Sequence, residues 1–137
     1  MMGGQVAERR AESEKVTINL GFVDLGHVDL LVREGFYGNR TDFIRTAIRN
    51  QLDRHEEAAR QSLGRRRLQL GLSHYGTREL EAARDAGEML DIRVLGLATI
   101  AADVTPDLAR ATIGSLTILG ALHASPAVKA ALADRIT

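Results

Sequence analysis

The sequence contains no cysteine among its 137 residues. A disulfide framework and a thiolate metal site are therefore excluded, and the composition suits a reducing compartment. The sequence also lacks any run of about 18 apolar residues, the length that a membrane-spanning helix requires. Residues 1–14 are polar and charged, without the apolar segment of a secretory signal. We therefore expect a cytoplasmic protein.

An excess of charge of either sign is absent as well. The 18 Lys and Arg residues balance 18 Asp and Glu residues. The overall charge therefore gives no electrostatic sign of a nucleic-acid partner. A partner of that kind can be inferred only from the positions of individual residues.

Catalytic and metal-binding motifs are missing too. The histidines are scattered along the chain, and no two have the His-Glu-x-x-His spacing of a zinc site: they are His27, His55, His74 and His123. His74 and Tyr75 fall in a turn-like stretch, where a surface role is expected. The sequence has no phosphate-binding glycine loop, no Gly-x-Ser-x-Gly motif and no dinucleotide fingerprint. We expect no enzyme activity, no metal and no cofactor.

The composition is that of a globular protein, with 45% hydrophobic and 26% charged residues. The length allows one ordinary domain or two small ones. Residues 1–14 lack periodicity and predict a mobile arm. We divide the rest into a first domain at 15–55, a charged linker or helix extension at 56–67, and a second domain at 68–137.

Polar and apolar residues alternate through residues 15–20, which predicts a short, half-buried strand. The apolar face of this strand consists of Val16, Ile18 and Leu20. Its polar face consists of Lys15, Thr17 and Asn19.

Two amphipathic helices are predicted after the strand. The first spans residues 23–34, and Gly35 ends it, because a left-handed residue after a helix is favourable mainly for glycine. The second spans about residues 41–55, with Asn39 or Thr41 as its cap. Its apolar stripe comprises Phe43, Ile44, Ala47, Ile48 and Leu52.

One short strand and two helices enclose too little core for a stable monomer. The strand also leaves both of its edges unpaired. A dimer solves both problems, because two strands can pair antiparallel above four packed helices.

The C-terminal half repeats a short pattern. Leu-Gly pairs occur at residues 70–71, 95–96 and 119–120, spaced by 25 and 24 residues. A helix-start signal follows each pair, at Thr77, Thr105-Pro106 and Ser125-Pro126. This predicts three strand–turn–helix units that bury their apolar sides by stacking. The alternative is coincidence in a chain rich in leucine and glycine.

The first domain resembles the ribbon-helix-helix family of repressors, of the CopG, Arc and MetJ type. The likeness covers about Lys15 to Leu52 and rests on the strand KVTINL, the break at Gly35 and the stretch GNRTDFIRTAIRNQL. The C-terminal half is not assigned to a family. The resemblance implies an α+β protein: a dimer with an intermolecular two-stranded antiparallel ribbon and four helices, followed here by the small repeat domain.

In that family the ribbon enters the major groove of double-stranded DNA. The resemblance therefore implies base contacts from the polar face, Lys15, Thr17 and Asn19. Lysine can donate to guanine, asparagine pairs with adenine, and threonine contacts either a base edge or a thymine methyl group. The alternative is a solvated strand face, which alternation alone would also give.

The family also holds phosphate at the first turn of the second helix. Here the matching residues are Gly38, Asn39, Arg40 and Thr41. Free backbone N–H groups and the positive end of the helix dipole bind anions there. An ordinary capped helix is the alternative, and Arg40 could instead pair with an acidic residue of the dimer.

These features predict a sequence-specific DNA-binding transcriptional regulator of the bacterial cytoplasm, associated with the nucleoid, with no membrane partner. We expect a repressor that acts as a dimer, or as a larger assembly through residues 68–137. A closed domain or one that binds an effector is the alternative for that half. An antitoxin and a self-assembling structural protein with a DNA-binding end are the alternatives for the whole chain.

Overall fold

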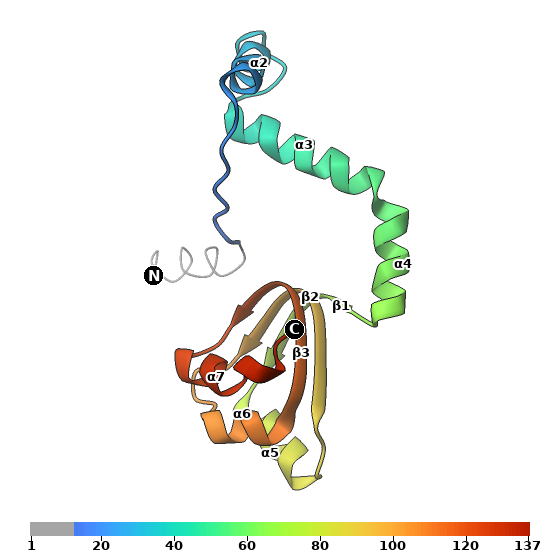
Figure 1. Cartoon of the computed structure of the whole chain (residues 1–137), viewed down its shortest axis with the longest axis vertical. Helices are drawn as coiled ribbons and strands as arrows, with labels where there is room; N and C mark the ends of the chain where they lie inside the picture. The colour runs from blue at the N-terminus through green and yellow to red at the C-terminus, as the bar shows by residue number, and fades with distance from the viewer. Residues whose placement is uncertain (1–12) are drawn as a thin grey trace. The chain divides into compact units, whose positions relative to one another are not determined.

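A computed structural model of the chain describes residues 13–137 (Figure 1). Within it, residues 15–65 and 66–137 form two compact units, which are considered separately below. The predicted mobile arm at residues 1–14 lies outside the described residues except for Ser13 and Glu14. No helix in the described part of the chain is long and apolar enough to cross a membrane.

The first unit consists of an extended segment and three helices: α2 (Phe22–Arg33), α3 (Arg40–Arg54) and α4 (Glu56–Arg66). Helix α4 occupies most of the segment expected to be a linker or helix extension. Residues 15–20 form an extended segment (Figure 1), but they pair with no strand in the described part of the chain. The predicted strand is therefore not formed among the described residues, because none of them supplies a partner for either edge.

The helix boundaries in this unit follow from local sequence. Gly35, after the C-cap Glu34, has a φ of 86°, the left-handed conformation that favours glycine. The side chain of Asn39 caps α3, because its Oδ1 accepts a hydrogen bond of 2.7 Å from the backbone N–H of Asp42. Thr41, the other candidate for this cap, lies inside the first turn of α3.

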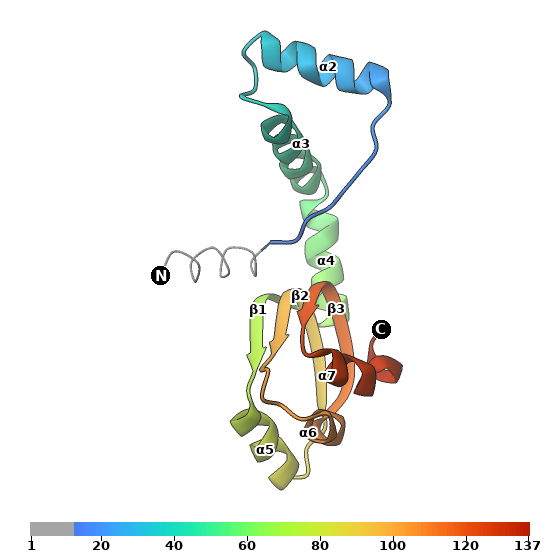
Figure 2. The same ribbon diagram turned by 90° about the vertical axis from the view of Figure 1, so that its left-hand side faces the viewer.

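The second unit alternates strands and helices. Its strands are β1 (Gln69–Tyr75), β2 (Leu90–Ile100) and β3 (Ile113–His123), and they lie side by side in a parallel sheet of order β1-β2-β3 (Figure 2). The helices are α5 (Thr77–Asp85), α6 (Pro106–Thr112) and α7 (Pro126–Ala131), and the short 3-10 helix η1 (Ala133–Arg135) follows them. His74 and Tyr75 therefore end a strand and do not form the turn expected from the sequence.

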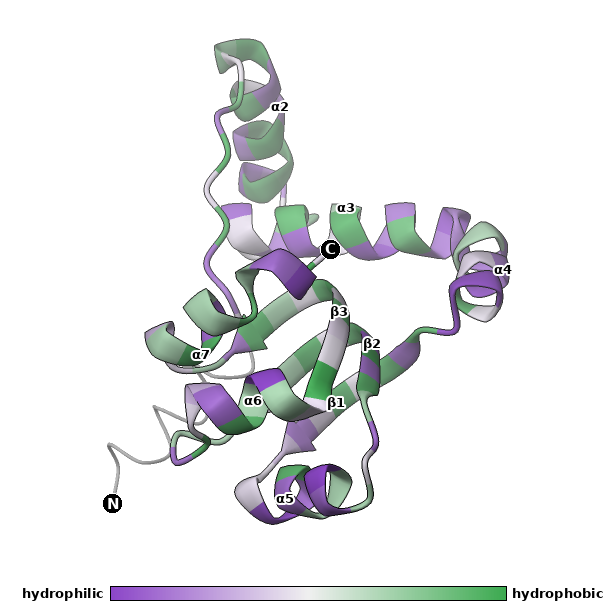
Figure 3. Ribbon diagram, turned by 60° about the horizontal axis from the view of Figure 1, so that its bottom comes forward, coloured by the Kyte–Doolittle hydropathy of each residue, from purple (hydrophilic) through white to green (hydrophobic). Residues whose placement is uncertain are grey.

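The core of the second unit lies between the sheet and the helices. Figure 3 shows hydrophobic residues along the strands. The fully buried large side chains come from every repeat: Leu80, Val94, Ile113, Leu116, Val128 and Leu132. The sheet's other face carries exposed leucines, with Leu70 74% and Leu72 73% exposed.

The three Leu-Gly pairs align across the sheet. Gly71 pairs with Gly96, and Gly96 pairs with Gly120. The φ angles of these glycines are 120°, 140° and 122°, so the same backbone distortion passes through all three strands. The predicted repeat is therefore present in the structure, with one glycine per strand at the same level.

Two of the three expected helix caps are confirmed. Thr105 Oγ1 accepts from the N–H of Leu108 at 3.1 Å, and Ser125 Oγ accepts from the N–H of Val128 at 3.2 Å. The prediction for Thr77 is wrong: Gly76 is the N-cap, and the buried Thr77 hydroxyl has no partner among the described residues. Unlike the other two sites, Thr77 lacks a following proline to fix the first helical residue one position later.

Candidate nucleic-acid interface

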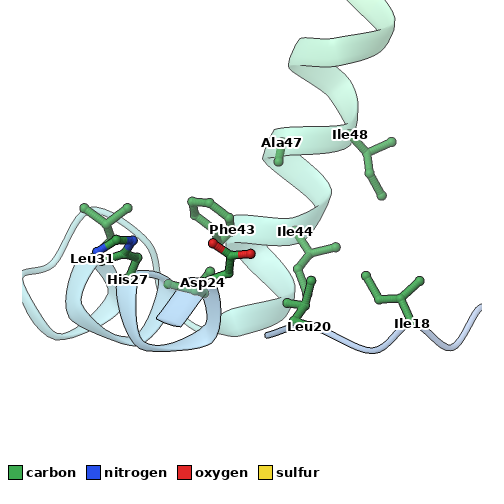
Figure 4. A pocket seen from close by; sticks show the side chains of 10 residues that line it. Ile18, Leu20, Asp24, His27, Leu31, Phe43, Ile44, Ala47 and Ile48 are labelled. Carbon is green, nitrogen blue, oxygen red and sulfur yellow. The ribbon is translucent and has the colours of Figure 1, made fainter. Parts of the chain in front are cut away.

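The apolar face of residues 15–20 lies beside an open hydrophobic hollow. Ile18 and Leu20 line this hollow, together with side chains of α2 and α3 (Figure 4). Its volume is about 450 Å³. The lining from α3 includes Phe43, Ile44, Ala47 and Ile48, which belong to the stripe predicted from the sequence.

This unit has almost no buried core within one copy. Among residues 15–65, all of which the structure describes, only Val28 is buried. Val16, Ile18 and Leu20 remain 78%, 58% and 41% exposed. Apolar side chains left exposed on one segment and two helices in this way are typical of a surface that another element covers.

The polar face of the same segment is open to solvent. Lys15, Thr17 and Asn19 are all exposed, and the alternation of an extended chain places them opposite Val16, Ile18 and Leu20. The three side chains offer ammonium, hydroxyl and amide groups along one face, a set able to bond to base edges.

The first turn of α3 contains free backbone donors. Asp42 accepts from the N–H of Gly38 at 2.9 Å, and its own N–H is bonded to Asn39. Within the described residues, the N–H groups of Arg40 and Thr41 bond to no acceptor. Both residues belong to the four expected phosphate contacts, and both present unused donors.

An open hollow of about 410 Å³ lies at this helix end. It is lined by Gly38, Asn39, Thr41, Asp42 and Arg45. Arg45 was not among the expected site residues, although a basic residue one helical turn after the N-terminus is visible in the sequence. It adds a positive charge near the free N–H groups and opposes the negative charge of Asp42.

The side chain of Arg40 is engaged within its own copy. Its guanidinium donates two hydrogen bonds of 2.8 Å to the carboxylate of Asp29 in α2. These bonds, with the attraction of the two charges, lower the pKa of Asp29 and raise that of Arg40. The pair fixes the start of α3 against α2, so the Arg40 side chain has a structural role in the single copy.

The sequence profile of the Ribbon-Helix-Helix transcriptional regulator family matches residues 11–129. The chain belongs to the Ribbon-Helix-Helix transcriptional regulator family. The match extends over nearly the whole chain, so the likeness is not confined to the N-terminal third as expected. No match was found among curated proteins or among solved structures.

Family membership implies DNA-binding regulation of transcription, and such families are typically not enzymes. The described part of the chain holds no cluster of three or more metal-ligating side chains.

Proposed function

We propose that this protein is a sequence-specific DNA-binding repressor whose DNA-binding domain is a dimer of residues 15–55. The observation that carries this proposal is the extended, unpaired segment 15–20 beside the apolar hollow. A second copy would pair with this segment antiparallel and would close the hollow with its own helices. Ile18 and Leu20 would then be buried between the copies.

Pairing of the two segments would produce a ribbon with one apolar and one polar face. Lys15, Thr17 and Asn19 from each copy would lie on the outer face, where a two-stranded ribbon contacts bases in the major groove. The net charge of zero limits the phosphate contribution to affinity. The proposal therefore assigns sequence preference to these polar side chains.

Phosphate binding is assigned to the first turn of α3. The unbonded N–H groups of Arg40 and Thr41, the helix dipole and the Arg45 side chain support an anion site there. Gly38 and Asn39 shape the turn, since the Gly38 N–H is already bonded to Asp42. Contacts of this kind fix the position of the ribbon on the duplex.

Residues 68–137 are proposed to join dimers into larger assemblies on DNA. Several weakly charged dimers would then bind neighbouring sites together, and multivalency would raise the apparent affinity. An operator occupied in this way blocks access to a promoter. The C-terminal unit has its own buried core, unlike an antitoxin tail that folds on its toxin.

The experiment that tests this function is selection of genomic DNA fragments by the full-length protein. We expect recovery of a short motif with two related half-sites, because a two-fold dimer reads two copies of one sequence. Fragments recovered without any shared sequence would overturn the assignment and would favour the structural-protein alternative.

A further inference from the structure

One edge of the sheet, at β1, is open as far as the described residues extend. Among the described residues, β1 pairs only with β2. The carbonyl of Tyr75 accepts from the N–H of Ala101, which follows β2, so this peptide group points toward β2. Because the peptide groups of successive residues in a strand point to opposite sides, those of Leu72 and His74 point toward the open edge.

The opposite edge, at β3, is covered over only part of its length. Ile136 forms a bridge with Leu116, and the N–H of Thr137 donates to the Leu116 carbonyl at 2.8 Å. Past Leu116, no described strand pairs with this edge. The open part of β3, residues 118–123, pairs on its other side with residues 94–99 of β2.

The two open edges lie at the same level of the sheet. Residues 94–99 of β2 also pair with residues 69–74 of β1. The uncovered part of β3 therefore matches β1 in length and in register. If β3 of a second copy were placed against β1 in the same register, residues 118–123 would pair with residues 69–74. These are the residues of β3 whose outer edge no described strand covers.

The glycine ladder adds a second match. A Cβ atom on Gly96 would lie 2.1 Å from the carbonyl oxygen of Gly71, and one on Gly120 would lie 2.1 Å from that of Gly96. Each glycine thus packs on the carbonyl of the glycine in the preceding strand. Gly71 has the same left-handed backbone, with a φ of 120°, but faces open space in this direction. The carbonyl of Gly120, by the same repeat, points to the open edge of β3.

We infer that the C-terminal units of successive copies stack head to tail, with β3 of one copy parallel to β1 of the next. Gly120 would pair with Gly71, and Leu119 with Leu70. This would extend the row Leu70, Leu95 and Leu119 across the interface. The inference rests on the proposed assembly role of this unit and names the surface that performs it.

This contact differs from the proposed ribbon dimer in its symmetry. Two different edges meet, so each added copy presents another open edge, and the copies form a filament unless the rotation between them closes a ring. With a two-fold dimer at the other end of the chain, such stacking would link dimers along DNA. The register match favours a second copy of this chain as the occupant over an unrelated strand.

Cysteine cross-linking of the full-length protein tests the stack, since the natural chain has no cysteine. Neighbouring strands lie about 4.8 Å apart, within the Cα separation of a disulfide. Inside one copy, residues 70 and 119 are two strands apart, roughly 9.6 Å, which is too far for a disulfide. A mixture of Leu70→Cys and Leu119→Cys proteins should give a cross-linked pair on mild oxidation. Each variant alone should give little, and the double variant should give a ladder of multimers.

A matched control shifts the register by two residues. Leu72→Cys should cross-link with Ala121→Cys but at least several-fold less with Leu119→Cys. Efficient cross-linking of Leu70→Cys with itself would show β1–β1 pairing and overturn the inference. Absence of a cross-link between Leu70→Cys and Leu119→Cys would overturn it as well.

The same samples separate this inference from the proposed function. Light scattering reports whether assemblies larger than a dimer form, and DNA binding reports the ribbon. Larger assemblies without the 70–119 cross-link would refute the head-to-tail contact and keep the assembly role. Simple dimers that still bind DNA would refute both, but would leave the DNA-binding assignment intact.

Discussion

The guanidinium of Arg40 and the carboxylate of Asp29 form a two-point ion pair, with both N–O distances equal to 2.8 Å. The pair joins α2 to the first residue of α3, the helix end assigned to phosphate binding. It therefore sets the angle at which the free N–H groups of this helix are presented.

The Asp29–Arg40 pair should make stability depend on pH. Arg40 lowers the pKa of Asp29 in the folded protein below its ordinary value of 3.8. The stabilisation is therefore fully present above that value and is lost as the pH falls through the folded-state pKa. Asp29→Asn should lower the thermal midpoint at pH 7, and the difference from the natural protein should shrink as the pH falls below 3.8. Asp53→Asn, on the exposed surface of α3, is the control; a constant difference for Asp29→Asn across this range would refute the pair's role.

The backbone N–H of Arg40 can be removed by substitution with proline. Asn39 is extended, with φ −164° and ψ 178°, a conformation that suits the residue before a proline, and the first helical position tolerates proline. Arg40→Pro and Arg40→Ala both lose the guanidinium, but only Arg40→Pro loses the donor. We expect Arg40→Pro to bind DNA several-fold more weakly than Arg40→Ala, equally for operator and unrelated sequences, in titrations at fixed salt. Equal affinities of the two variants would remove this N–H from the phosphate site.

The ribbon dimer predicts opposite effects for two adjacent residues. Ile18 lines the apolar hollow, whereas Thr17 lies on the polar face. Ile18→Asp would bury a charge between copies, so it should abolish the dimer of residues 15–55. Thr17→Asp should leave dimerisation unchanged and weaken DNA binding. Analytical ultracentrifugation of each single variant measures the oligomeric state, and a DNA titration measures binding. A dimer that survives Ile18→Asp would contradict the arrangement.

The glycine ladder predicts a sharp contrast between two Gly→Ala substitutions. At Gly96 the new methyl group would meet the Gly71 carbonyl at 2.1 Å, on a backbone with a φ of 140°. We expect a loss of more than about 3 kcal/mol in the free energy of unfolding. At Gly64, inside α4, the added Cβ has nothing within 4 Å, and alanine should stabilise the helix by roughly 0.5–1 kcal/mol. Denaturant titration distinguishes the two, and a mild effect at Gly96 would show that the ladder is not a tight contact.

Features determined by neighbouring residues were predictable from the sequence. Gly35 ends the first helix, Asn39 caps the second, and the Leu-Gly pairs mark the three strands, because each depends on local backbone chemistry. The likeness to the family was also visible over residues 38–52. The local pattern gave the wrong N-cap at Thr77. Helix α5 begins at Thr77 itself, one residue earlier than a Thr77 cap would imply.

Features that depend on tertiary packing were not predictable. The Asp29–Arg40 pair joins residues eleven positions apart on two helices, and Arg45 enters the α3 hollow only once the loop before it has folded. The parallel register that aligns Gly71, Gly96 and Gly120 likewise arises from packing of the whole second unit. Alternation predicted a strand at residues 15–20, but strand pairing also needs a neighbouring edge, and none of the described strands pairs with this segment.

We propose above that the polar face of residues 15–20 reads DNA sequence. The most direct measurement compares the fragments selected from genomic DNA by the natural protein and by the triple variant Lys15→Ala, Thr17→Ala and Asn19→Ala. Light scattering should first show that both have the same oligomeric state, because these side chains lie away from the apolar hollow. We expect the triple variant to lose the selected motif while keeping weak, sequence-independent binding. An unchanged motif would contradict it.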